Sequence, residues 1–218
     1  MSKRKGCMVQ VLFTSFDRRY TEGEWARKFC LLPQTTQTRI MKYHRWQDRQ
    51  AKMLGYLLLK EGLRDCGYAL KSDVFIDHCG RPYVNHDVDF NISHTDGCVV
   101  CAVTSQGRLG IDIEKIKPID FTDFKDCMSS VQWEKIQESN NIYASFFDSW
   151  TIKESTLKAD GRGLSFPLEN VETHGNQAML DGRSWYITKL DISPGTSCHL
   201  ACDLQDIQLE INEIHFKD

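Results

Sequence analysis

Gly110-Ile111-Asp112-Ile113-Glu114 is a stretch in which apolar and acidic side chains alternate, and this period of two predicts a β-strand. Asp112 and Glu114 would point to the same side of that strand with Cα atoms about 6.6 Å apart, so both carboxylates can converge on one cation. Ile111 and Ile113 would face a core on the other side. An edge strand with one solvated face produces the same alternation, so this stretch by itself leaves metal binding and a plain edge strand as alternatives.

Turn-rich sequence surrounds this strand. Asp96-Gly97 and Gln106-Gly107 separate predicted strands over Phe90–Ser93, Cys98–Thr104 and Leu109–Glu114. The other predicted elements are, in chain order, a strand over Val9–Phe13, a short helix over Glu22–Phe29, a long helix over Thr38–Leu63, a short strand over Val74–Ile76, one or two short helices over Phe121–Glu138, a helix from Asn140-Asn141 to Lys158, and a meander of strands over Val171–His174, Gln177–Leu180, Trp185–Asp191, Cys198–Leu204 and Leu209–Ile214.

The length and composition fit an α+β protein. The chain has 218 residues, which suits one domain or two small halves, and we place the boundary between residues 1–115 and 116–218. The formal net charge of −3 argues against a dedicated nucleic-acid binder. No stretch approaches the roughly 18 apolar residues that a membrane helix needs, so we expect no membrane partner. Nine cysteines without a tight framework indicate reduced thiols and a cytoplasmic protein.

A second acidic position lies on the predicted helix that ends at Lys158. Trp150, Glu154 and Lys158 follow one another at steps of four, so they share one helix face. Glu154 and Lys158 alone could form a surface ion pair of a few tenths of a kcal/mol. Trp150 on the same face favours partial burial instead.

Asp112, Glu114 and Glu154 together would form an all-oxygen cluster. Two carboxylates 4 Å apart repel by about 4 kcal/mol at an effective dielectric constant of about 20, which corresponds to roughly three pKa units. Such a cluster either takes up a proton or holds a cation. Oxygen ligands without His or Cys select magnesium, manganese or calcium, and magnesium is often bound by one or two carboxylates together with substrate phosphate.

Several basic and polar residues are candidates for phosphate binding. Ser93 and His94 end a predicted strand, where a lone turn histidine is also compatible with a plain surface position. Arg39 and Lys42 open the long predicted helix, where positive charge is unfavourable for the helix dipole and a ligand anion would compensate. The remaining candidates are Arg81, beside Pro82, and Lys153 and Lys158, which flank Glu154.

The ordered set of motifs resembles the phosphopantetheinyl transferases of the larger, monomeric Sfp type. That family pairs a Gly-hydrophobic-Asp-x-Glu strand with a downstream Trp-x-x-Lys-Glu-x-x-x-Lys helix, and here Trp150 lies 38 residues after Asp112. The resemblance extends over about residues 38 to 170. Further matching segments are Asp48 to Gly55, Gly80-Arg81-Pro82, Asn91-Ile92-Ser93-His94, Gly161-Arg162-Gly163-Leu164 and Pro167-Leu168.

The resemblance implies a pseudo-dimeric α+β fold of two similar halves, with coenzyme A and the active site between them. It implies that Asp112, Glu114 and Glu154 hold magnesium, with manganese as an alternative. Where some members carry a basic phosphate ligand this chain has Thr36, and Arg39 or Lys42 would compensate. The implied contacts of coenzyme A are Arg39, Lys52, Arg81, Ser93, His94, Asp112, Lys153 and Lys158.

The resemblance also implies a reaction. The 4′-phosphopantetheine group would pass from coenzyme A to a serine of an apo acyl or peptidyl carrier protein, giving holo carrier and adenosine 3′,5′-bisphosphate. Glu154 would take the serine proton, directly or through water, and Lys158 would stabilise the leaving phosphate. A phosphodiesterase or nuclease, and a non-catalytic binding protein, are the alternatives. Fatty-acid, polyketide, peptide-synthetase and lysine-pathway carriers all stay open.

The carrier is expected to dock beside the helical segment Phe121–Tyr143 of a monomeric enzyme. The apolar candidates for this contact are Phe121, Phe124, Met128 and Trp133. The alternative is that these side chains form a small core of their own.

Overall fold

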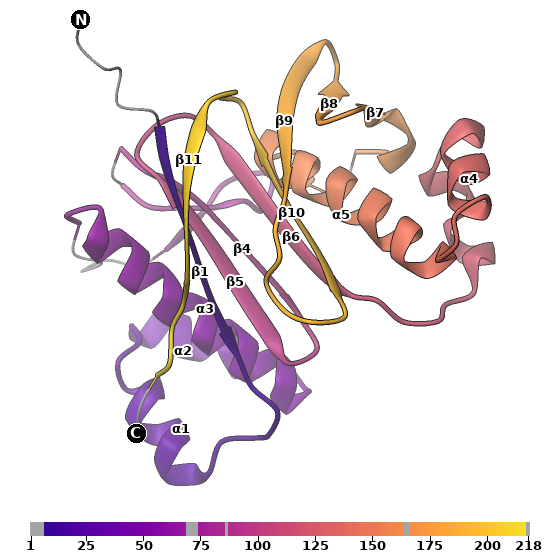
Figure 1. Ribbon diagram of the computed structural model, residues 1–218. Helices are drawn as coiled ribbons and strands as arrows, with labels where there is room; N and C mark the ends of the chain where they lie inside the picture. The colour runs from indigo at the N-terminus through magenta and orange to yellow at the C-terminus, as the bar shows by residue number, and fades with distance from the viewer. Residues whose placement is uncertain (1–6, 69–73, 86, 164–165, 217–218) are drawn as a thin grey trace, which may run out of the picture.

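The computed structural model describes residues 7–68, 74–85, 87–163 and 166–216 (Figure 1). Its strands are β1 (Cys7–Ser15), β2 (Phe75–Ile76), β3 (Pro82–Tyr83), β4 (Asp89–Thr95), β5 (Cys98–Thr104), β6 (Leu109–Lys115), β7 (Glu172–His174), β8 (Gln177–Leu180), β9 (Arg183–Lys189), β10 (Thr196–Cys202) and β11 (Ile207–Glu213). Its helices are α1 (Glu22–Phe29), α2 (Gln34–Ile40), α3 (Trp46–Asp65), α4 (Ser130–Gln137) and α5 (Ile142–Asp160), with 3-10 turns η1 (Phe121–Cys127) and η3 (Leu168–Asn170).

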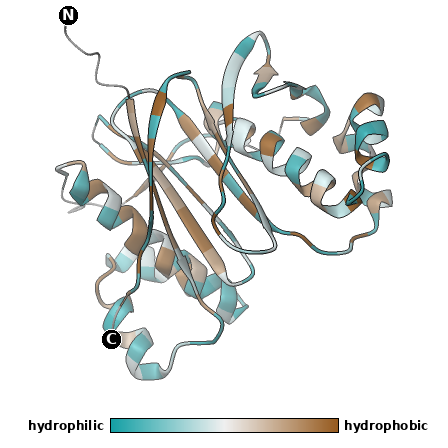
Figure 2. Cartoon of the chain, viewed as in Figure 1, coloured by the Kyte–Doolittle hydropathy of each residue, from teal (hydrophilic) through white to brown (hydrophobic). Residues whose placement is uncertain are grey.

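Two main sheets form the centre of the molecule. One has the strand order β11-β1-β5-β4 and the other β6-β10-β9-β8-β7. Apolar side chains of both sheets, among them Val9, Val100, Ile111 and Leu200, are fully buried in one shared cluster. Helix α3 packs on the first sheet and α5 on the second, so each half is a sheet covered by one long helix (Figures 1 and 2). The predicted α+β fold of two similar halves is confirmed.

The predicted long helix over Thr38–Leu63 is wrong at its start, because two helices occupy this region. Helix α2 begins right after Pro33, whose ring suits a helix entry, and ends at Ile40. The side chains of residues 41–45 are all exposed, so a helix continued through them would bury no apolar face. Helix α3 starts at Trp46, where the buried face resumes.

The C-terminal strands depart from a simple meander. Strands β7 to β10 run antiparallel to their neighbours as predicted, but β11 crosses over and pairs in parallel with β1. Strand β6 meanwhile pairs with β10 in the second sheet. Strand pairing therefore passes the proposed boundary after residue 115 in both directions, and that boundary stays a prediction.

The two sheets meet at the edges of β4 and β6 through side chains instead of backbone carbonyls. Alternate backbone N–H groups of β6 donate to polar side chains of β4. The pairs are Leu109 with Asp89 (2.8 Å), Ile111 with Asn91 (3.0 Å), Ile113 with Ser93 (3.4 Å) and Lys115 with Thr95 (2.9 Å). This seam explains why the Asn91-Ile92-Ser93 segment alternates polar and apolar residues, and it satisfies an edge that would otherwise lack partners.

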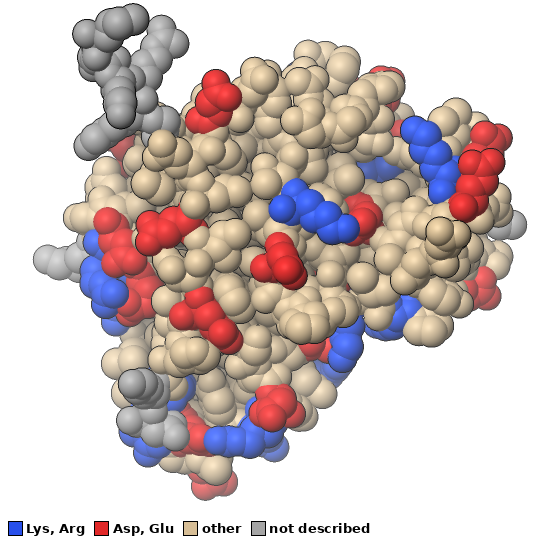
Figure 3. All heavy atoms as spheres, in the orientation of Figure 1, with Lys and Arg blue, Asp and Glu red and all other residues tan. Residues whose placement is uncertain are grey.

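Two further observations concern the whole chain. All nine cysteines are free thiols. Within the described ranges, none of the helices has both the length and the apolar character that a membrane crossing requires. On the face drawn in Figure 3, acidic and basic side chains are interspersed.

Candidate active site

The acidic residues of β6 and α5 meet because Gly110 lets the helix approach the strand. A Cβ atom at this position would overlap the carbonyl oxygen of Ser155 and the backbone nitrogen of Ala159. Backbone contact at this point sets Glu154 of α5 near Asp112 and Glu114 of β6. The glycine of the motif therefore allows α5 to pack closely on β6, and this packing brings the acidic residues of the two elements together.

The three carboxylates share a buried environment. Asp112 and Glu154 are buried, with 3% and 7% of their surface exposed, and Glu114 is half-buried. Burial, and next the negative charge of Asp112, raise the pKa of Glu114 to about 7, against the opposing effect of Lys158. The same causes raise the pKa of Glu154 to about 7. Near neutral pH these groups therefore compete for protons, which a cation can replace.

Asp112 is held on one side only. Its Oδ1 accepts hydrogen bonds from Nζ of Lys158 (2.6 Å) and Oγ of Ser93 (2.8 Å), and Lys158 also donates to Ser93 (3.0 Å). Its Oδ2 is buried and has no hydrogen-bond partner within the part of the chain that the structure describes. A buried, unpaired carboxylate oxygen is costly, and a divalent cation is a fitting partner for it among neighbouring carboxylates.

The acidic cluster is not gathered into a closed ligand set. One oxygen from each of Asp112, Glu114 and Glu154 does not come within 4.8 Å of the other two, a criterion that among the described residues only Asp77, His78 and Cys79 meet. Mutual repulsion of the carboxylates, with Lys158 bonded to Asp112, accounts for this spread.

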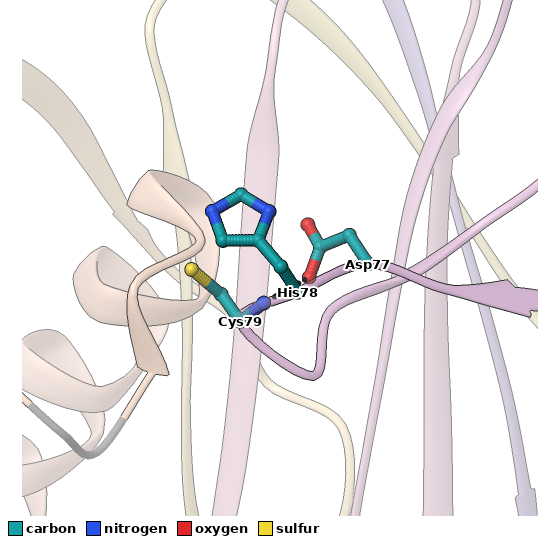
Figure 4. Close-up of side chains that lie close together, drawn as sticks. All are labelled: Asp77, His78 and Cys79. Carbon is teal, nitrogen blue, oxygen red and sulfur yellow. Dashed lines mark hydrogen bonds between the residues drawn. The ribbon is translucent and has the colours of Figure 1, made fainter.

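Asp77, His78 and Cys79 lie in the turn between β2 and β3 (Figure 4). Oδ1 of Asp77 accepts hydrogen bonds from the backbone N–H groups of Cys79 and Arg81, both at 2.9 Å. These bonds lower the pKa of Asp77. The proximity of the three side chains thus follows from a turn closed by an aspartate.

A cavity of about 450 Å³ opens beside the acidic cluster. Its walls come from α2, α3, the β2–β3 turn, β4 and the C-terminal end of α5, so both halves contribute. Apolar side chains such as Tyr43, Ile40 and Pro82 line it together with four basic residues, namely Arg39, Lys52, Arg81 and Lys158. The size falls in the usual range for small-molecule sites, and the lining suits a ligand with a flat apolar part and several phosphates.

Lys52 and His94 lie in the electrostatic field of Lys158. Burial and then the charge of Lys158 lower the pKa of Lys52, while Asp48 opposes this. Burial, followed by Lys52 and Lys158, lowers the pKa of His94 to about 4. His94 is therefore a neutral imidazole near pH 7, and an anion entering here would relieve the repulsion between the two lysines.

Arg81 lies in the cavity wall with its guanidinium already engaged. It donates to both carboxylate oxygens of Asp89 (2.9 and 2.8 Å), to the carbonyl of Leu109 (2.9 Å) and to the carbonyl of Lys158. It thereby holds the end of α5 against the β4–β6 seam. Arg39, in contrast, is exposed at the cavity and donates to the carbonyl of Val74 (3.0 Å).

Lys153 lies away from the site, which corrects its predicted contact with the pyrophosphate. Its side chain is fully buried, and Nζ donates to the carbonyls of Leu168 (2.8 Å) and Val171 (3.1 Å). Burial lowers its pKa to about 8. One helix position separates it from Glu154, about 100° around α5, and this rotation turns it toward η3.

The expected exposed face over Phe121–Tyr143 is largely a core. Met128 is only 5% exposed, and Phe121, Phe124 and Trp133 pack around Phe146. The alternative of a small separate core therefore describes these side chains better. A groove of about 270 Å³ remains, lined by Phe121, Trp133, Gln137 and Ile142.

Residues in the other segments that match the family have structural roles. Asn91 belongs to the β4–β6 seam and Gly55 packs against Ile92. Gly161 ends α5 in a left-handed conformation (φ 96°), which glycine adopts without strain. Leu164 lies outside the described residues.

A buried polar group around His199 was missed from the sequence. His199 of β10 is opposite Asp112 in the strand register and is 4% exposed. Its Nδ1 lies 2.7 Å from Oγ1 of Thr151 on α5. The available signal was a histidine that alternates with buried apolar residues of a predicted strand.

Comparison with known proteins matches two consecutive regions of the chain. Residues 108–199 match the 4′-phosphopantetheinyl transferase superfamily, and residues 19–106 match the N-terminal region of 4′-phosphopantetheinyl transferases. The first match contains the acidic cluster, and the second contains α2, α3 and β4. The two regions meet between β5 and β6.

Individual relatives cover most of the chain. The 4′-phosphopantetheinyl transferase gsp of Aneurinibacillus migulanus is 33% identical over 174 residues, which are 78% of this chain and 73% of gsp. The 4′-phosphopantetheinyl transferase Sfp of Bacillus subtilis (strain 168) is 26% identical over 215 residues, 93% of this chain and 96% of Sfp. Another 4′-phosphopantetheinyl transferase of Bacillus subtilis is 29% identical over 172 residues, 74% of this chain and 75% of that protein.

Proposed function

The chain belongs to the 4′-phosphopantetheinyl transferase superfamily and is an enzyme of the holo-[acyl-carrier-protein] synthase type, and for this enzyme we propose the following substrates, reaction and residue roles. Its substrates are coenzyme A and an apo carrier protein. The proposed reaction moves 4′-phosphopantetheine to a carrier serine and releases adenosine 3′,5′-bisphosphate, with magnesium bound at the acidic cluster and manganese as an alternative.

The acidic cluster fits a divalent cation. Oδ2 of Asp112 is buried and unpaired among the described residues, and burial together with the charge of Asp112 raises the pKa of Glu114 and of Glu154 to about 7. Bound magnesium would offset the negative charge of the coenzyme A pyrophosphate. Asp112, Glu114 and Glu154 are the proposed ligands.

The basic lining of the cavity is proposed to bind the nucleotide part of coenzyme A. Lys158 lies at the boundary between cavity and acidic cluster, where its ammonium can stabilise the leaving phosphate. Arg39 and Lys52 also line the cavity and are proposed to bind the remaining phosphate charge. The neutral His94 has one N–H that would donate to the nucleotide, and Ser93, whose hydroxyl proton goes to Asp112, is proposed as a further contact of the nucleotide. Arg81 shapes the wall through Asp89.

Glu154 is proposed to take the proton of the carrier serine, directly or through a water molecule. A carboxylate oxygen positioned at the reacting group can accept a proton as a general base. Glu154 is also the residue that α5 sets opposite Asp112. The observation that carries the proposal is this meeting of a buried unpaired carboxylate oxygen, a high-pKa glutamate and a basic cavity across the two halves.

The carrier protein is proposed to dock at the groove between η1, α4 and α5, within Phe121–Tyr143. This groove is lined by Phe121, Trp133, Gln137 and Ile142. We propose a monomeric enzyme, because one chain supplies both walls of the cavity, and a cytoplasmic one, because its nine thiols are free.

The test is to incubate the protein with coenzyme A, magnesium and a panel of apo carrier proteins, and to weigh the carriers by mass spectrometry. A gain of one phosphopantetheine group on a carrier, lost in EDTA and restored by magnesium, is the expected result. Cleavage of coenzyme A without a modified carrier would refute the assignment. Which carriers gain the group identifies the pathway.

A further inference from the structure

A chain of polar side chains, buried at Thr151, Ser197 and His199, ties α5 to the second sheet, and the reaction described above does not use it. Lys189 of β9 donates to Oδ2 of Asp148 (2.6 Å), and Oγ of Ser197 donates to Oδ1 of the same carboxylate (2.6 Å). Oγ of Ser197 lies 3.0 Å from Oγ1 of Thr151, which lies 2.7 Å from Nδ1 of His199. Thr151 and Ser197 are fully buried.

The hydroxyl of Thr151 carries one proton and lies within hydrogen-bond distance of the carbonyl of Phe147 (2.8 Å) and of Nδ1 of His199 (2.7 Å). In the arrangement in which Thr151 donates to Phe147, its oxygen accepts from Nδ1–H of His199. The 3.0 Å contact between Thr151 and Ser197 then holds no proton, because Ser197 donates to Asp148. Burial lowers the pKa of His199 to about 4, so the ring is neutral near pH 7, as a single N–H donor requires.

The chain lies directly under the proposed metal ligands. In the antiparallel pair of β6 and β10, His199 is opposite Asp112 and Ser197 is opposite Glu114, so these four side chains share the sheet face that α5 covers. Thr151 precedes Glu154 by three residues, and residues at this spacing lie on adjacent parts of one helix face. A turn of α5 about its axis would move Thr151 and Glu154 together.

We propose that Thr151 and His199 are positioning residues of the transferase, whose hydrogen bond fixes the rotation of α5 over β10 and so holds Glu154 opposite Asp112 and Glu114. Gly110 sets how close the helix comes, and Arg81 and Lys158 hold its C-terminal end. Thr151 constrains the helix about one turn before Glu154. The hydrogen-bonded chain supplies the directional constraint, since hydrogen bonds depend strongly on angle. This inference rests on the proposed metal site.

The test measures Mn²⁺ affinity by electron paramagnetic resonance or calorimetry, without coenzyme A or carrier. Thr151→Val keeps the shape of the side chain and removes the hydroxyl, and we expect it to weaken Mn²⁺ binding about tenfold, the usual effect of losing a residue that orients metal ligands. Thr151→Ser keeps the hydroxyl and should restore most of the affinity. The Michaelis constant for coenzyme A should change little, because Thr151 does not line the cavity.

Thr156→Val is the matched control. Thr156 is also fully buried on α5 and also donates to a carbonyl one turn earlier, that of Ile152 (2.7 Å), yet its hydroxyl makes no bond to β10. This variant should keep wild-type Mn²⁺ affinity. Equal losses for Thr151→Val and Thr156→Val would reduce the role of Thr151 to general packing and overturn the inference.

A double-mutant cycle isolates the Thr151–His199 bond. His199→Asn retains an N–H donor near the position of Nδ1, and His199→Leu removes it. Combining His199→Leu with Thr151→Val should weaken Mn²⁺ binding no more than either change alone, because both remove the same bond. Fully additive losses would contradict it. If wild-type protein itself binds no Mn²⁺, the proposed metal site fails, whereas wild-type affinity in folded Thr151→Val refutes only the positioning role.

Discussion

Replacing Glu154 by Gln is expected to stabilise the metal-free protein at pH 8 while abolishing transfer. Burial, together with the charges of Asp112 and Glu114, raises the pKa of Glu154 from 4.5 to about 7. One pKa unit corresponds to about 1.4 kcal/mol, so ionising this group in the folded protein costs about 3 kcal/mol. Glutamine has nearly the same shape and no charge, so it removes this cost.

The pH window follows from the direction of the pKa change. Between pH 4.5 and 7 the folded protein retains a proton on Glu154 that the unfolded chain has released, so the free energy of unfolding falls as pH rises through this interval. The advantage of Glu154→Gln should therefore be below about 1 kcal/mol at pH 5 and approach about 3 kcal/mol at pH 8.

Urea unfolding in EDTA at pH 5 and pH 8 measures this difference. Glu134→Gln, at an exposed position of α4, is the control and should change the free energy of unfolding little at either pH. Saturating Mg²⁺ should then stabilise wild type more than Glu154→Gln, by about 2.7 kcal/mol at a hundredfold excess over the dissociation constant if the variant no longer binds. Equal unfolding free energies of wild type and Glu154→Gln at pH 8 in EDTA would refute the reasoning.

Three further predictions follow from the site. Gly110→Ala should prevent α5 from packing on β6, so the variant should lose its cooperative thermal transition by circular dichroism; a wild-type melting temperature would contradict this. Lys153→Met should destabilise the fold by about 1–3 kcal/mol, because two buried carbonyls lose their donor, yet leave coenzyme A affinity by calorimetry unchanged, whereas Lys158→Met should weaken that affinity. Arg81→Lys has one terminal nitrogen and cannot bind Asp89 and the carbonyl of Lys158 at once as the two guanidinium nitrogens do, so its melting temperature should fall, and an unchanged value would count against the wall role of Arg81.

Local patterns in the sequence were enough to predict the elements that carry the acids. The alternation around Asp112 predicted β6 and the side of the strand that the carboxylates share. The spacing of Trp150, Glu154 and Lys158 predicted one face of α5. These predictions hold because strand and helix periods are fixed by backbone geometry, whatever the element packs against.

Only the tertiary structure decided what each face meets. Pairing of β11 with β1 and the bond between Thr151 and His199 join residues far apart in the chain. The burial of Lys153 under η3 and the engagement of Arg81 by Asp89 join nearer residues that belong to different elements. Such contacts depend on how helices and sheets dock, and the spacing of residues along the chain carries no information about the partner across a seam. The sequence by itself therefore determined which side chains share a face of β6 or α5. The packing of α5 on β6 and of β6 against β4 determined which of these side chains form the site. Gly110 lets α5 approach β6, and polar side chains of β4 bind the backbone N–H groups of β6.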